Sequence, residues 1–379
     1  MENLMRRGRR RGAGLALAVA VMLGITACTA SDPGPTQSQT TADVAVDNDA
    51  NLAVSPVDYD GKMVVTAQFS EPVKGRAVTL QVKDAAGWSD VAKAKQDADG
   101  LVVFQAPTGE GEFRALAAAT DVSGEAQAAV ATRPSSAAAQ WQQALSSDFT
   151  EAELPAPWTY SISGSYAAGG RQCSAPFPTN VKLDDGNVVL SMTKETDKAQ
   201  IAASKAAGCK KGQYYRNAML TTEGQFSVRQ GTLAARVKFG EEQGMHGSVF
   251  LLSSKMQEID MIESYGYGWG LTNVIHVDGK RNPVENADTY VLKEQVKDRD
   301  WWDEYHVFSV EWGATDVVFR VDGDETRRLH DRKLDDEYFV FVSLLSSDWE
   351  LKRLKDPVKN APGVKPTKLP GSMSVDWVK

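Results

Sequence analysis

Short runs of alternating apolar and polar residues recur along this chain of 379 residues, separated by turns that contain glycine. Residues 63–69, 77–82, 101–105, 187–193 and 306–312 are runs of this kind. Runs of this length, separated by turns at intervals of about ten residues, are typical of antiparallel strands. No long segment repeats its apolar residues with the 3.6-residue period of an amphipathic helix. We therefore expect an all-β protein.

Changes in composition divide the chain into several predicted segments. At roughly 100–200 residues per domain, the length allows two domains. We expect a signal peptide, a flexible tether rich in Ser, Thr, Gln and Pro, a small β-sandwich domain, a linker with Pro and an Ala run, and a large second domain. Their predicted ranges are 1–27, 28–51, 52–132, 133–147 and 148–379. The pattern of the small domain resembles immunoglobulin or fibronectin type III modules. We expect it to act as a spacer, and ligand binding is the alternative.

The first 27 residues have the organisation of a bacterial export signal. Five arginines lie between positions 6 and 11, and an apolar run of about 15 residues follows, which suits a signal peptide better than a membrane span. The run ends at Ile25-Thr26-Ala27-Cys28, which resembles a lipobox. We expect export and a lipid anchor at Cys28 that holds the protein to the outer face of the bacterial cell membrane. A plain signal peptide is the alternative.

Two further cysteines, Cys173 and Cys209, remain after Cys28 is assigned to the anchor. Exported proteins tend to pair their thiols, so we expect a disulfide between these two residues. Two separate buried thiols are the alternative.

The charge balance excludes one class of partner. The chain has 42 Lys and Arg against 50 Asp and Glu, a net charge of −8. Nucleic-acid binding needs clustered basic residues, so we expect no nucleic-acid partner. We also expect the protein to be a monomer. Residues 352–368 carry several basic residues, which we expect to form a solvated loop.

Three carboxylates lie among apolar residues in the segment Glu258-Ile259-Asp260-Met261-Ile262-Glu263. Side chains alternate along a strand, so Glu258 and Asp260 share a face, whereas Glu263 is out of phase. A β-bulge, which inserts one extra residue, would return Glu263 to the face of the other two. We predict that bulge. An exposed edge strand with solvated acids is the alternative interpretation.

The predicted bulge brings the carboxyl groups of Glu258 and Glu263 to roughly 5 Å from each other, the separation of a retaining glycosidase. Like charges this close disfavour the ionisation of all three acids, so we expect at least one to stay protonated near neutral pH.

Several segments in order resemble one known family. From about Trp158 to the C-terminus the chain is similar to glycoside hydrolase family 16, the group of laminarinases, lichenases and agarases. The resemblance rests on the catalytic segment and on 231–238, Trp312, 321–323 and 374–378. It implies a concanavalin-like β-jelly roll with a cleft across its concave sheet, and hydrolysis of a polysaccharide.

The resemblance also implies roles for particular residues. Glu258 would be the nucleophile, Glu263 the general acid and base, and Asp260 a hydrogen-bonding partner between them. His276 would contact the acid cluster. The family often binds a structural calcium, for which Asp376 is a weak candidate ligand, and it requires no other cofactor.

The cleft positions depart from the family pattern. His246 and Phe250 stand where two cleft tryptophans are usual. Tyr265 and Trp269 follow the catalytic strand, and Trp349 ends the segment where the family usually has an Asn and two Gly. We expect these five aromatic or histidine side chains to contact sugar, because sugar rings stack on aromatic faces. The glycan is left open between β-1,3-glucan, a galactan and a cell-envelope glycan. A wall transglycosylase and a non-catalytic carbohydrate-binding lipoprotein are the alternative functions.

Overall fold

The structure is a computed structural model that describes most of the chain. The described residues are 44–161, 174–206, 215–242, 244–266, 271–276, 287–292, 302, 304–314, 316–330, 332–346 and 369–379. The three cysteines, Trp269, Trp349 and the basic segment 352–368 lie outside these ranges. Within the described ranges, no helix has the length and hydropathy to cross a membrane.

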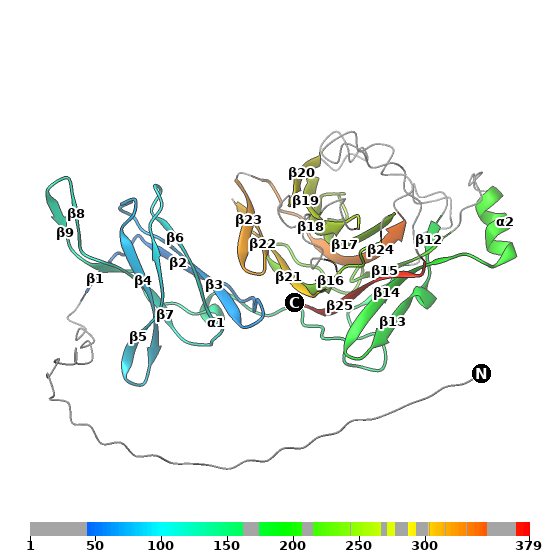
Figure 1. Ribbon diagram of the computed structural model, residues 1–379, viewed down its shortest axis with the longest axis horizontal. Coiled ribbons are helices and arrows are strands. Elements are labelled where there is room, and N and C mark those ends of the chain that lie inside the picture. The colour runs from blue at the N-terminus through cyan, green and yellow to red at the C-terminus, as the bar shows by residue number, and fades with distance from the viewer. Residues whose placement is uncertain are drawn as a thin grey trace, which may run out of the picture. The chain divides into compact units, whose positions relative to one another are not determined.

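The first domain is a small β-sandwich, drawn in blue and cyan in Figure 1. One sheet has the strand order β1-β10-β7-β4-β5 and the other β2-β3-β6, with a separate β8-β9 hairpin. Its strands are β1 (Ala45–Val46), β2 (Asn51–Val54), β3 (Lys62–Gln68), β4 (Ala77–Asp84), β5 (Gly87–Lys95), β6 (Leu101–Pro107), β7 (Phe113–Ala117), β8 (Thr120–Val122), β9 (Glu125–Gln127) and β10 (Val130–Ala131). Val54, Val65 and Leu80 are fully buried in its core. The strands of this domain agree with the all-β class, whereas its likeness to immunoglobulin or fibronectin type III modules stays a prediction.

The second domain is built from one long sheet that curls on itself (Figure 1). The strand order is β20-β19-β18-β17-β24-β15-β14-β25-β16-β21-β22-β23, with β11, β12 and β13 paired at its sides. These strands are β11 (Thr159–Tyr160), β12 (Ser174–Pro176), β13 (Val181–Asp184), β14 (Asn187–Lys194), β15 (Tyr215–Thr221), β16 (Gly231–Lys238), β17 (Met245–Ser253), β18 (Glu258–Ser264), β19 (Leu271–His276), β20 (Ala287–Val291), β21 (His306–Trp312), β22 (Asp316–Val321), β23 (Asp324–His330), β24 (Tyr338–Ser346) and β25 (Gly371–Val378).

The core of the second domain lies between the two halves of the curled sheet. In β14 every second residue is buried, and these are Val188, Leu190 and Met192. They join one cluster with residues from the other half, such as Val249 and Ile259. The alternating pattern therefore produced the expected two-layer packing, and the all-β prediction is confirmed.

The helices described are short. They are α1 (Ala137–Gln140), the 3-10 turn η1 (Pro178–Asn180) and α2 (Lys198–Ala206). Helix α1 lies in the range expected to be a linker, yet it is fastened to β2: the Gln140 side chain bonds the backbone of Leu52 and Val54, and the Trp141 indole donates to the Val54 carbonyl at 2.9 Å. This stretch is therefore packed against the first domain.

The two domains share a buried contact. Its apolar part is a cluster of Val57, Tyr59, Val64, Ala234 and Val307. The Tyr59 hydroxyl lies 2.7 Å from the Ser309 Oγ within this seam. At its edge, the Arg236 guanidinium bonds Asp60 at 3.0 Å. The seam thus combines apolar burial with satisfied polar groups.

Replacing Tyr59 with Phe should destabilise the protein through this seam. The variant leaves the hydroxyl of Ser309, which is 1% exposed, without its tyrosine partner. We expect the free energy of unfolding to fall by about 1 kcal/mol, measured by urea denaturation. Tyr160→Phe is the matched control, because Tyr160 is 41% exposed. Equal effects of the two substitutions would show that the seam hydrogen bond adds nothing.

Candidate active site

The strand β18 carries the three acids on the face that points away from the core. Ile259 and Ile262 are fully buried and pack into the core cluster. Glu258 and Asp260 alternate with Ile259 and therefore point to the other face, which we call the site face. The neighbouring strands β17 and β19 flank β18 on its two sides.

A β-bulge brings Glu263 to the site face. Against β17, Ile262 pairs with Val249 and Asp260 pairs with Phe250, so Met261 is the extra residue. Against β19, three steps from Asp260 to Glu263 match two steps from Val274 to Thr272. The predicted bulge is confirmed, and Glu263 shares the face of Glu258 and Asp260.

A buried amide supports the bulge. The side chain of Asn273 on β19 is 1% exposed, and its Nδ2 donates to the Met261 carbonyl at 2.6 Å. The bond satisfies a backbone oxygen at the bulged residue. The sequence reasoning missed Asn273, although a polar residue on the core-facing side of an apolar strand was a usable signal.

Glu263 is held by three side chains. The His246 Nε2 lies 2.7 Å from its Oε1, and the Tyr265 hydroxyl donates to the same oxygen at 3.4 Å. The Thr272 hydroxyl donates to Oε2 at 3.0 Å. Thr272 was not predicted, although it lies on the same strand face as His276, four residues earlier.

Asp260 lies beside the second histidine. The His276 Nε2 is 3.3 Å from the Asp260 Oδ2, and His276 pairs directly with Glu258 across the two strands. The expected contact between His276 and the acid cluster is present. Two imidazoles and three carboxylates therefore meet on the site face.

The pKa of Glu258 is strongly perturbed. Burial, and after it the charge of Asp260, raise it from the ordinary 4.5 to about 8. The nearby His276 acts in the opposite direction. The site therefore retains a proton at neutral pH, as the proximity of the three acids predicted.

The aromatic residues expected to contact sugar have protein partners in the structure. The Phe250 ring stacks on Phe341 of β24 at a centroid distance of 4.9 Å. The His246 ring stacks on Tyr265 at 4.6 Å. Trp302, a further aromatic residue near the site, is 2% exposed and donates its indole N–H to the Ser264 Oγ at 3.0 Å, so it belongs to the core. Sugar contact by Phe250, His246 and Tyr265 stays a prediction.

Asp376, the candidate calcium ligand, forms an ion pair in the structure, in which the Arg236 guanidinium lies 3.0 Å from its Oδ2. Calcium binding by Asp376 stays a prediction. Among the residues that the structure describes, no group of three His, Cys, Asp or Glu is arranged to hold a metal.

The second domain matches one known protein family. The sequence profile described as "Glycosyl hydrolases family 16" matches residues 176–379. No curated protein matches the chain.

Among solved structures, the laminarinase from Rhodothermus marinus aligns with 18% identity and a TM-score of 0.50, over 63% of this chain and 96% of that one. The laminarinase catalytic domain from Thermotoga maritima MSB8 aligns with 21% identity and a TM-score of 0.49, over 63% and 96%. The endo-β-1,3-glucanase from Pyrococcus furiosus aligns with 18% identity and a TM-score of 0.49, over 69% and 96%. At such identities the likeness concerns the fold alone.

Proposed function

The chain belongs to glycosyl hydrolases family 16 and is a glycoside hydrolase, and from this premise we propose that it is a retaining, endo-acting enzyme that cleaves a β-linked polysaccharide. Glu258 is the nucleophile and Glu263 is the general acid and base. The observation that carries the proposal is the bulge at Met261, which places both glutamates on one face of β18. A regular strand would turn Glu263 into the core.

The reaction proceeds by double displacement. The Glu258 carboxylate attacks the anomeric carbon while the glycosidic C–O bond breaks, and the Glu263 proton passes to the departing oxygen. Water then attacks the same carbon, its proton passes to the Glu263 carboxylate, and the ester bond to Glu258 breaks. The sugar leaves with its original configuration.

The histidines support the charge state that this mechanism needs. Glu258 must be ionised at the moment of attack, although burial and Asp260 raise its pKa. The neighbouring His276 and His246 both lower that pKa. General acid catalysis requires a proton on Glu263 when the substrate reacts.

The proposal includes the position of the enzyme in the cell. The arginine cluster, the apolar run and the Cys28 motif favour export and a lipid anchor on the outer face of the bacterial cell membrane. The β-sandwich of the first domain then acts as a spacer, and Cys173 and Cys209 form a disulfide. A soluble or wall-bound polysaccharide reaches the enzyme outside the cell.

A glycan panel tests the substrate and the reaction together. The purified protein is incubated with a soluble β-1,3-glucan, a mixed-linkage β-glucan, a galactan and a purified cell-envelope glycan, with Glu258→Gln beside it. We expect shortened oligosaccharides from one glycan, absent with the variant, when products are sized by chromatography. Lengthened products would identify a transglycosylase instead. Binding of every glycan without turnover would contradict the proposal and indicate a carbohydrate-binding protein.

A further inference from the structure

The contact between His246 and Glu263 is not explained by sugar binding. Both residues are 7% exposed, and His246 directs its Nε2 at the carboxylate, 2.7 Å from Oε1. A buried imidazole needs a hydrogen-bonding partner, and here that partner is the general acid itself. The side chain of His246 is thus engaged by an acid of the site.

A second contact fixes the imidazole. The Tyr265 ring stacks on the His246 ring with an interplanar angle of 17° and a centroid distance of 4.6 Å. The Tyr265 hydroxyl also reaches Glu263 Oε1 at 3.4 Å. Tyr265 therefore restrains the plane of the ring and contacts the same oxygen.

The other oxygen of Glu263 is also held. The Thr272 hydroxyl donates to Oε2 at 3.0 Å from the opposite neighbouring strand. Side chains from β17 and β19, on both sides of β18, thus hydrogen-bond to one carboxyl group. A glutamate with both oxygens engaged samples few rotamers, so its proton is presented in one direction.

Orientation of this kind bears directly on general acid catalysis. A proton donor contributes only when it lies within hydrogen-bond reach of the departing oxygen and is correctly directed. We propose that His246 is a positioning residue that holds Glu263 in its proton-donating orientation, with Tyr265 restraining the imidazole. This inference rests on the proposed function, because it takes Glu263 as the general acid.

The departing group distinguishes positioning of the acid from a general structural role. An alcohol of a polysaccharide needs a proton to depart, whereas 2,4-dinitrophenolate departs without one. A defect in Glu263 orientation should slow cleavage of the first substrate and spare the second. A distorted site should slow both equally.

The test compares His246→Phe and His246→Gln on two substrates, a soluble β-1,3-glucan and the 2,4-dinitrophenyl β-glycoside of its disaccharide. The Phe variant keeps the ring stack and loses the nitrogen, while Gln keeps a hydrogen-bond donor. For His246→Phe we expect kcat on the glucan to fall about 10- to 100-fold with little change in KM. On the dinitrophenyl glycoside, kcat/KM should stay within about threefold of the wild type, and Gln should restore most of the glucan rate.

Two controls keep the outcome decisive. Glu263→Gln is assayed in parallel. Full activity of Glu263→Gln on the glucan would overturn the proposed function. If Glu263→Gln is inactive but His246→Phe keeps the wild-type rate, only the inference about His246 is overturned. An equal loss on both substrates would also overturn the inference, because it indicates a structural role. If His246→Phe does not fold, as judged by its thermal melt, Tyr265→Leu carries the same comparison, since it removes the stacking ring.

Discussion

Glu258→Gln should abolish hydrolysis while leaving the protein folded. The amide is close in shape to the carboxylate but cannot form the covalent glycosyl ester, so we expect a loss of about 10⁴-fold in kcat. The measurement is the release of reducing ends from the glycan identified in the panel. Glu223→Gln is the matched control. It makes the same change at an exposed turn after β15, outside the catalytic strand, and should leave the rate of hydrolysis unchanged.

The same substitution should stabilise the protein at alkaline pH. The pKa of Glu258 rises from 4.5 to about 8 on folding, so between these values the native state binds more protons than the unfolded state. Stability then falls as pH rises, and the favourable contribution present below pH 4.5 is lost by about pH 8. Gln carries no charge, so the stability of the variant does not fall with this ionisation.

Thermal melts at pH 5 and pH 8.5 check that expectation. The melting temperature of Glu258→Gln relative to wild type should be higher at pH 8.5 than at pH 5. A difference in melting temperature between Glu258→Gln and wild type that is smaller at pH 8.5 than at pH 5 would contradict the argument that burial opposes the Glu258 charge. Gain of stability with loss of turnover is the pattern expected of a catalytic group held in an unfavourable environment.

The site was predictable from sequence where the chemistry is local. Glu258, Asp260 and Glu263 lie within six residues, and the phase of a strand is a fixed physical rule, so only an extra residue could align them. The strands were predictable for the same reason. Residues 187–193 were expected and β14 runs from Asn187 to Lys194. The strand β5 was missed because its residues lack a regular alternation of burial.

Apart from His276, which the family resemblance indicated, the side chains that contact the acids were not predicted, because these contacts depend on how distant strands pair. His246 meets Glu263 only after the register of β17 against β18 is set by the bulge. Phe250 was expected to contact sugar, yet its ring packs on Phe341, which reaches it because β24 inserts beside β17. The Tyr59–Ser309 contact depends on how the two sandwiches pack. None of these contacts follows from local periodicity.

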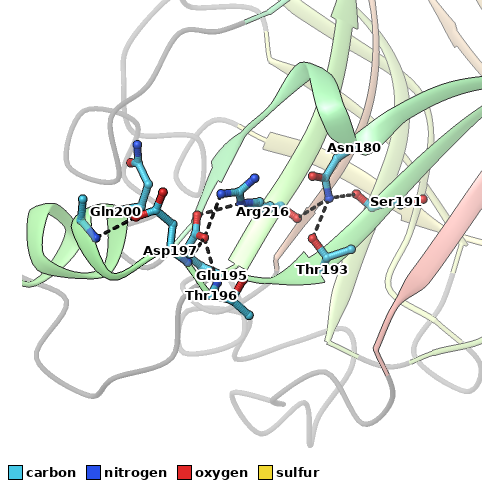
Figure 2. Close-up of polar contacts among 9 residues, drawn as sticks. Asn180, Ser191, Thr193, Glu195, Thr196, Asp197, Gln200 and Arg216 are labelled. Atoms are coloured by element: carbon cyan, nitrogen blue, oxygen red, sulfur yellow. Dashed lines mark hydrogen bonds and ion pairs between the residues drawn. The ribbon is translucent and has the colours of Figure 1, made fainter.

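Arg216→Met should destabilise the second domain more than any surface charge change. Arg216 on β15 makes two parallel bonds to Glu195, from Nε at 2.8 Å and from Nη2 at 2.9 Å (Figure 2). The Glu195 side chain is fully buried, whereas that of Arg216 is 27% exposed. The guanidinium also lies over the Phe177 ring at 4.5 Å. Replacing the cation removes two charge-assisted hydrogen bonds from a fully buried carboxylate, which costs about 3 kcal/mol.

The pair also joins three elements of the site-bearing domain. Glu195 follows β14 directly and accepts bonds from the backbone N–H groups of Thr196 and Asp197, both at 2.8 Å. Asp197 in turn accepts the N–H of Ala199 in the first turn of α2, at 2.7 Å. The ion pair therefore fixes the end of β14, the start of β15 and the entry to α2 together.

Urea denaturation of three variants separates this ion pair from ordinary surface pairing. Arg229→Met is the matched control, since the Arg229–Glu337 pair is 3.4 Å long and its side chains are 61% and 50% exposed, so we expect a loss below about 1 kcal/mol. The double variant Glu195→Leu with Arg216→Met also removes the buried carboxylate, so it should be more stable than Arg216→Met alone. If the double variant is instead the least stable of the three, the two side chains stabilise the protein through packing. The loss in Arg216→Met would then not come from the charge of Glu195.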